Sequence, residues 1–254
     1  MTRDAARSAR LVRAACVGGL IALAPLAARA QDSCDCAAPT LPVRWSIFVS
    51  TGAATLQTSQ INALLGPAGY FAVSNDAVGT GAGAFSSFGP LRLGVEHVRL
   101  DGGSESTPTG LSARIEARYT AFTVGWDLRP RRRLSIAPTL GVGRGSYLLT
   151  VGDRNGGATA PVAPPPTFNE ILAAPGSSSR INGKAWIFEP MLAADLLILR
   201  RSSERLGITL GARVGYRFAP NRPDWQYRGE AVAGGPIDQA KGPVARITFG
   251  VGGR

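Results

Sequence analysis

Apolar and polar residues alternate with a period of two through much of the chain. Between Leu206 and Phe218 every even position is apolar or aromatic, and every odd position is Gly, Thr or Arg. A helix would mix these two sets on all of its faces, whereas a strand places successive side chains on opposite faces. The pattern therefore predicts a β-strand with one apolar and one polar face.

The same alternation recurs along the chain and predicts eight strands. The connection after the first strand contains a stretch, 56–65, with partial helical periodicity that ends at Gly66-Pro67, which indicates a short helix. Pro138 and Pro190 fall inside predicted strands, and we expect local bulges there because proline removes a ladder hydrogen bond. The predicted strands are 44–52, 76–86, 91–99, 113–128, 134–151, 184–199, 205–218 and 243–253.

The connections between these strands alternate strictly between long and short. Barrels of the bacterial outer membrane have short periplasmic turns and longer loops outside. The order therefore predicts an all-β fold, an eight-stranded antiparallel up-and-down transmembrane β-barrel, with both ends of the chain in the periplasm. The long connections are 53–75, 100–112, 152–183 and 219–242, and the short ones are 87–90, 129–133 and 200–204.

The less apolar face of the predicted strands combines glycine with ionisable residues. This mixture suits a narrow barrel interior, in which opposite charges meet across the lumen. Eight strands enclose only enough space for side chains, so we interpret these residues as a structural charge network that fills the lumen. An anion-binding or selectivity lining is the alternative. The predicted lumenal residues are Arg92, Glu96, Arg114, Glu116, Arg118, Asp127, Glu189, Asp195, Arg213, Arg217 and Arg246.

Aromatic residues gather near the predicted strand ends. Such clustering resembles the interfacial girdles of outer-membrane barrels, although aromatic residues are common in any strand. Trp45 and Trp126 are expected toward the periplasmic side, and Tyr147, Trp186, Tyr216 and Phe218 toward the opposite rim.

These segments together resemble the small outer-membrane β-barrel class of the OmpA/OmpX-like type over most of residues 44–254. The resemblance rests on the alternation described above, on the hairpin GTGAGAF-turn-LRLGVE at 79–96 and on the closing strand VARITFGVGG. It implies insertion by the outer-membrane assembly machinery and a barrel without a wide pore. Barrels of this type commonly end in an aromatic residue, whereas this chain ends Gly252-Gly253-Arg254.

The first 30 residues have the composition of an export signal. Four arginines precede the apolar run 14–27, and Ala28-Arg29-Ala30 fits the small-x-small cleavage rule, so we expect Gln31 to begin the mature chain. The run is shorter than a membrane-spanning helix needs, which disfavours an anchor. We expect a signal peptide at 1–30, a periplasmic N-terminal tail at 31–43 and an outer-membrane barrel at 44–254.

Charge modifies the expected partners. Removing residues 1–30 takes five arginines and one aspartate from the 28 basic and 17 acidic residues, which leaves 23 and 16 and a net charge of about +7. An exported chain rarely meets nucleic acid, so we expect phosphate-rich outer-membrane lipid and lipopolysaccharide as the anionic partners. No mature segment has 18 consecutive apolar residues, which disfavours a helical membrane protein. The sequence does not indicate an oligomeric state.

The sequence offers few candidates for chemistry. His97 is the only histidine, and a lipid-modifying hydrolase could combine it with Ser104, Ser106 or Ser112 near the outer rim. We favour a rim histidine without a catalytic partner and predict no catalytic, cofactor or metal site. For the C-x-C pair at 34–36, a flexible tail, a strained disulfide and a metal or redox site stay open, as does the redox state of Cys34 and Cys36.

The sequence therefore predicts a non-enzymatic outer-membrane barrel with a structural or surface-interaction role and a lumen plugged by charged side chains. Three alternatives remain open. The first is a narrow porin-like channel for small solutes or anions. The second is a lipid-modifying outer-membrane enzyme, and the third is a soluble periplasmic β-barrel or sandwich that binds a ligand.

Overall fold

The computed structural model describes residues 45–128, 133–156, 167–200, 206–237 and 241–253. The expected signal peptide, the expected periplasmic tail and the cysteine pair lie outside the described residues, so the statements about them stay predictions.

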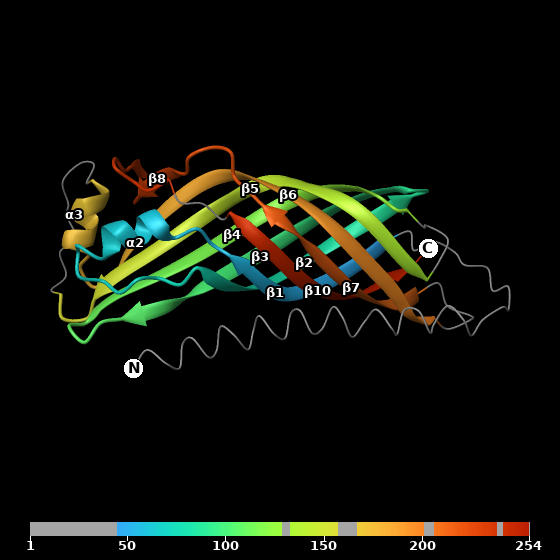
Figure 1. The fold of residues 1–254 in the computed structure, drawn as a ribbon, viewed down its shortest axis with the longest axis horizontal. Helices are drawn as coiled ribbons and strands as arrows, with labels where there is room; N and C mark the ends of the chain where they lie inside the picture. The colour runs from blue at the N-terminus through green and yellow to red at the C-terminus, as the bar shows by residue number, and fades with distance from the viewer. Residues whose placement is uncertain (1–44, 129–132, 157–166, 201–205, 238–240, 254) are drawn as a thin grey trace.

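Eight antiparallel strands close into a ring (Figure 1). Each strand of the ring pairs with the next one along the chain, and β10 pairs with β1 to complete the circle. The predicted eight-stranded up-and-down barrel is therefore confirmed. The ring strands are β1 (Trp45–Thr55), β2 (Asp76–Phe88), β3 (Leu91–Ser106), β4 (Leu111–Trp126), β5 (Leu134–Asp153), β6 (Ser179–Arg200), β7 (Leu206–Arg217) and β10 (Gly242–Gly253).

The register of the ladders sets the width of the barrel. A path that starts at Leu196 on β6 and steps through paired residues around the ring returns to β6 at Trp186, a displacement of ten residues. Such a stagger requires tilted strands, and with eight strands it leaves an interior just wide enough for side chains. The path runs through Leu210, Phe249, Val49, Ala82, His97, Thr120 and Arg144.

The wall of the barrel is higher on one side. Strands β3 to β6 have 16, 16, 20 and 22 residues, whereas β1, β7 and β10 have 11, 12 and 12. The extra length lies at the end with the long connections. There, two short strands that the sequence analysis did not predict, β8 (Asp224–Tyr227) and β9 (Glu230–Ala231), extend the sheet from β6.

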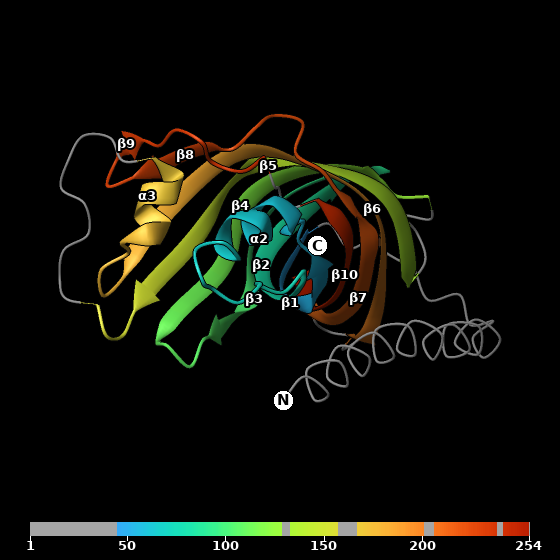
Figure 2. The same ribbon diagram turned by 60° about the vertical axis from the view of Figure 1, so that its left-hand side comes forward.

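Two short helices close the long-loop end of the barrel (Figures 1 and 2). Helix α2 (Ser59–Leu65) confirms the helix predicted near 56–65, and α3 (Phe168–Ala173) was not predicted. Ile61 and Leu65 of α2 are buried, as is Phe168 of α3. They share one apolar core with inward-facing residues of the long strands, such as Ile115 and Leu149.

A hydrogen bond joins the loops that carry the two helices. The hydroxyl of Tyr70, which follows α2, donates to the backbone oxygen of Leu172 in α3 at 3.0 Å. Burial, with a smaller contribution from Asp153, raises the pKa of Tyr70 to about 12, so the hydroxyl keeps its proton, and this hydrogen bond, into alkaline solution. We call α2, α3 and the loops that carry them the cap. The cap is a folded part of the barrel, because its two helices share an apolar core and are joined by this hydrogen bond.

The expectation of bulges at the two strand prolines is wrong. The β5–β6 register continues unchanged past both Pro138 and Pro190. Pro138 lies next to Thr139, the last β5 residue paired with β4, and Pro190 lies next to Met191, where the continuous β6–β7 ladder stops. Each proline lies where a neighbouring strand has stopped pairing, so its missing N–H needs no bulge. The register shifts that do occur lie between Asp101 and Ser104 in β3 and between Leu197 and Leu199 in β6.

Two inward-facing glycines of β5 provide a matched test of how closely the strands approach. A Cβ added to Gly143 would collide with the backbone of Thr120 and Ala121, whereas one added to Gly141 would make ordinary contact with Glu189 at 3.5 Å. We expect Gly143→Ala to lower the free energy of unfolding by about 1–3 kcal/mol and Gly141→Ala to change it little. Urea unfolding of the two folded barrels measures this, and equal midpoints would contradict it.

Candidate functional site

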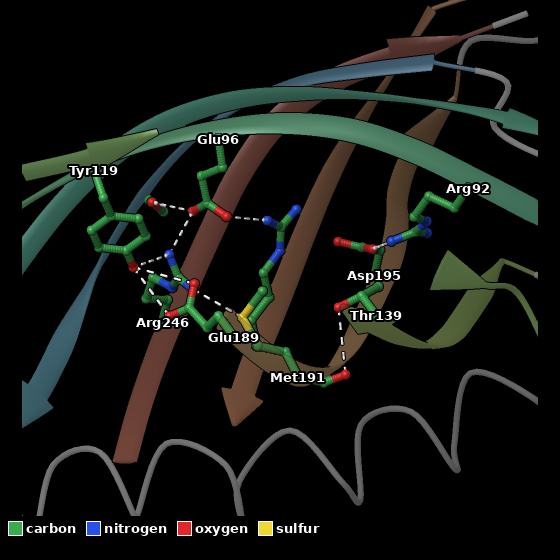
Figure 3. Close-up of polar contacts among 10 residues, drawn as sticks. Arg92, Glu96, Tyr119, Thr139, Glu189, Met191, Asp195 and Arg246 are labelled. Atoms are coloured by element: carbon green, nitrogen blue, oxygen red, sulfur yellow. Dashed lines mark hydrogen bonds and ion pairs between the residues drawn. The ribbon is translucent and has the colours of Figure 1, made fainter. Parts of the chain in front are cut away.

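The centre of the lumen is occupied by a charge network around Glu96, which lies on β3 and is 2% exposed (Figure 3). Arg213 of β7 donates to one oxygen of this carboxylate at 2.7 Å, and Arg246 of β10 donates to the other at 3.1 Å. Ser50 of β1 adds a third hydrogen bond at 3.2 Å. Residues from four strands therefore meet on one buried carboxylate.

Arg246 extends this network across the lumen to β6 and β4. Its guanidinium lies 2.8 Å from a carboxylate oxygen of Glu189 and donates to the hydroxyl oxygen of Tyr119 at 3.2 Å. The Tyr119 hydroxyl in turn donates to Glu189 at 3.1 Å. The hydrogen bonds and ion pairs thus join opposite walls of the barrel and hold them at a fixed separation.

A second charge cluster lies nearer the short turns. Arg92 of β3 pairs with Asp195 of β6 and lies 3.2 Å from Asp127, which follows β4. Ser135 accepts from Arg92 at 3.1 Å, and Ser87 donates to Asp127 at 3.2 Å. Figure 3 shows Arg92 and Asp195 as a group separate from the network around Glu96.

The charges of the described lumen balance. Four buried arginines face four buried carboxylates, and the arginines also stack on rings. The guanidinium carbon of Arg213 lies 4.0 Å from the ring centre of Phe48, and that of Arg92 lies 4.1 Å from Phe85. A cavity of about 10 Å³ lies among these side chains, which is room for about one water. The arginines are Arg92, Arg213, Arg217 and Arg246, and the carboxylates are Glu96, Asp127, Glu189 and Asp195.

Three of the eleven predicted lumenal residues lie instead on the outer wall. Arg114, Glu116 and Arg118 occupy even positions of β4, the same face as Phe122, whose side chain is 72% exposed. The inward positions between them are apolar and join the core beneath the cap. The prediction assigned the more polar row to the lumen along the whole strand, but beside the cap the inner row is apolar and the outer row is polar. Arg118 and Phe122 both occupy even positions of one strand, so the sequence already indicated that their side chains lie on the same face.

These outward residues form an ion-pair cluster with β3. Arg99 and Arg118 each lie 3.0 Å from the same oxygen of Glu116, and Arg114 lies 3.3 Å from its other oxygen. Arg114 also pairs with Asp101.

The structure does not bring His97 and the candidate serines together. His97 lies on the outer wall with Nδ1 2.9 Å from the hydroxyl of Thr120 on β4. Ser104 lies seven residues farther along β3, roughly 23 Å at the rise of a strand, and Ser106 pairs with Ser112 beyond it. Within the described ranges, no group of three His, Cys, Asp or Glu residues could hold a metal ion.

The aromatic residues follow the predicted girdles with one exception. Trp126 is 54% exposed on the outer wall at the short-turn end, and Trp186 and Tyr216 are 50% and 45% exposed toward the other end. Tyr147, which was expected among them, is 2% exposed and packs in the core beneath the cap, so that prediction is wrong. No helix of the described residues is both long and apolar enough to span a membrane.

Comparison of the chain with known proteins gives weak similarities to solved structures, all at about 10% identity and TM-scores below 0.5. No protein-family model and no curated protein matches it. It is similar to Neisserial surface protein A at 10% identity and a TM-score of 0.42, over 82% of this chain and 96% of that one. It is similar to a major outer membrane protein of Thermus thermophilus at 10% identity and a TM-score of 0.41, over 82% of this chain and 98% of that one. It is also similar to Ail of Yersinia pestis, solved with the heparin analogue sucrose octasulfate. The identity is 10% and the TM-score 0.35, over 83% of this chain and 95% of that one.

Removing the central carboxylate tests whether the lumenal network stabilises the barrel. Glu96→Gln leaves Arg213 and Arg246 without their shared partner in a water-poor interior, and we expect the free energy of unfolding to fall by roughly 3–5 kcal/mol. Glu105→Gln, at an exposed position of β3, removes the same charge and should change it by less than about 0.5 kcal/mol. Urea titration monitored by tryptophan fluorescence gives both values. Indistinguishable variants would show that the network adds no net stability.

Proposed function

We propose that the chain is a barrel that spans the bacterial outer membrane and serves a structural or surface-interaction role rather than a catalytic one. The supporting observation is an inverted distribution of polarity. Large apolar side chains are exposed on all eight ring strands, while the described lumen holds paired charges. Exposed examples, one from each strand in chain order, are Val49, Val78, Val95, Phe122, Leu140, Leu192, Leu206 and Phe249.

A soluble barrel would distribute these residues differently. Soluble monomers expose isolated apolar patches, whereas this apolar belt continues around the whole ring. A ligand-binding barrel would also keep an apolar cavity, whereas the cavity described between Phe48, Arg92 and Arg213 is lined partly by charged side chains and holds about 10 Å³. In a membrane, the exposed apolar side chains would contact hydrocarbon, and the charged side chains would be paired inside the lumen. The closed ring of antiparallel strands would also satisfy every backbone hydrogen-bonding group of the ladders without water.

The capped end supports the second half of the proposal. The long connections meet there, and α2, α3, β8 and β9 give them a folded structure with its own buried core. In the outer-membrane orientation that the loop lengths indicate, this end faces the exterior. A folded, solvent-facing end on a membrane anchor suits contact with an external partner, whereas His97 has no arranged catalytic neighbours.

The apolar belt can be tested by placing a charge in it. Phe122→Arg puts a guanidinium on the lipid-facing wall, which costs about 2–4 kcal/mol near the middle of a bilayer, so we expect less folded barrel in the outer membrane. Phe71→Arg, at a side chain 48% exposed beside the cap, is the matched control and should insert normally. Cell fractionation, followed by gel migration with and without boiling, reports both location and folding. Wild-type protein in the soluble periplasmic fraction would overturn the membrane proposal.

The filled lumen makes a distinct electrical prediction. Wild-type protein inserted into planar bilayers should give no steady ohmic conductance, because two charge clusters and an apolar cap occupy its interior. Stable conductance steps from the wild type would favour the porin-like alternative.

A further inference from the structure

The outer wall carries a second feature besides the apolar belt, a basic face on four adjacent strands. It comprises six outward-facing cations and two carboxylates on β3, β4, β5 and β6. The cations are Arg99, Arg114, Arg118, Arg144, Arg180 and Lys184, and the carboxylates are Asp101 and Glu116. Strand pairing makes these residues neighbours, since the row through Arg99 continues across Arg118 and Ser146 to Lys184. At the edge of the face, Lys184 is paired with the exposed Asp224 of β8.

The basic face begins where the apolar belt ends. On β4 the outward residues change from Phe122 through Thr120 to Arg118, and on β5 they change from Val142 to Arg144. Arg144 is paired with Trp186, which is 50% exposed. Exposed tryptophan is typical of the boundary between hydrocarbon and headgroups. The cations therefore lie at the headgroup level of the leaflet on the long-loop side.

The charge is confined to this side of the barrel. The row through Arg99 continues in the other direction into Thr80 of β2 and Thr51 of β1. Among the described outward-facing positions of β1, β2, β7 and β10 there is neither arginine nor lysine. A barrel that needed only a general positive rim would distribute its cations around the whole ring, so the cluster indicates a local anionic ligand.

Arg99 and Arg118 form the centre of the face. They lie directly opposite each other on adjacent strands, where like charges are destabilising. Their side chains are 48% and 47% exposed, and both contact one oxygen of Glu116. A guanidinium has five N–H donors in a planar fork that fits phosphate oxygens. Arg99 and Arg118 share Glu116 with Arg114, which also pairs with Asp101, so three arginines face two carboxylates. A phosphate bound across Arg99 and Arg118 would supply the missing negative charge.

We propose that the basic face binds the phosphate-bearing headgroup of a membrane lipid in the leaflet on the long-loop side, with the acyl chains of that lipid on the apolar belt below. The proposal rests on the proposed membrane-spanning function. It commits to a lipid because the cations continue directly into the belt, so one amphipathic molecule can contact both. A sulfated polysaccharide would contact the cations of the basic face but would not contact the apolar belt directly below them.

The experiment measures lipid retention by full-length protein folded in detergent micelles, with native mass spectrometry after addition of phosphatidic acid or phosphatidylcholine. We expect the wild type to retain phosphatidic acid in preference. Arg99→Gln with Arg118→Gln should weaken that binding about tenfold or more, since it removes charge-assisted hydrogen bonds to the phosphate. Glu116→Gln should strengthen it by roughly two- to fivefold, because it removes the competing carboxylate.

Two controls make the result specific. Arg154→Gln with Lys241→Gln removes the same charge from exposed positions outside the basic face and should leave lipid binding unchanged. Each variant is first checked for heat-dependent migration, so a failed fold is distinguished from a failed site. Equal loss in both double variants, or equal retention of the two lipids by the folded wild type, overturns the site while leaving the barrel intact. Displacement of the lipid by inorganic phosphate or a sulfated polysaccharide at equal affinity overturns the lipid as its ligand.

Discussion

Closure of the ring by the β1–β10 ladder is the constraint on which the rest of the structure depends. In hydrocarbon an unpaired backbone N–H or C=O costs several kcal/mol, so an open sheet edge is not tolerated. Closing eight strands with a stagger of ten residues leaves a lumen only as wide as its side chains. Glycines on the inner rows leave room for larger side chains of neighbouring strands, such as Phe48 beside Gly83 and Asp195 beside Gly211. The arginines that share this narrow lumen must be paired, because a water-poor interior makes an isolated charge very costly.

The strands β3 to β6 serve two different environments in succession. Near the short turns their outer rows are apolar and their inner rows are charged, as at Val95 and Glu96. Beside the cap the polarity is reversed, so Leu100 is buried in the apolar core while Arg99 and Asp101 lie outside. The reversal occurs without a change in the direction that each side chain takes, since the strand period of two is kept. In the proposed membrane orientation, the same reversal coincides with the end of the apolar belt on these strands.

This reversal also explains how much the sequence could predict. The ring strands and α2 were predicted because alternation and helical periodicity are local signals. Helix α3 has six residues, and its burial depends on contacts distant in sequence, such as the ring of Phe168 5.5 Å from that of Trp225. The predictions for Arg114, Glu116 and Arg118 are wrong because the polar row was assigned to the lumen along the whole of β4. The prediction for Tyr147 is wrong because an aromatic residue near a strand end was assigned to the outer girdle, whereas its side chain is buried beneath the cap. On β4 the three charged residues occupy even positions, as does the exposed Phe122, and this shared alternation correctly places them on the outer wall.

The lumenal charges have a further consequence for how the barrel reaches one register. A buried ion pair contributes little net stability compared with well-packed apolar residues, so stability alone does not account for the network. Arg213 and Arg246 lie directly opposite each other in the β7–β10 ladder and share Glu96 between them. If β10 slipped by one residue, every side chain on it would change face. Arg246 would then point into hydrocarbon, at a cost of about 2–4 kcal/mol near the bilayer centre, and Glu96 and Glu189 would each lose a partner. We infer that the main effect of the network is to destabilise barrels with a wrong strand register, since a shifted register would expose these charges to hydrocarbon.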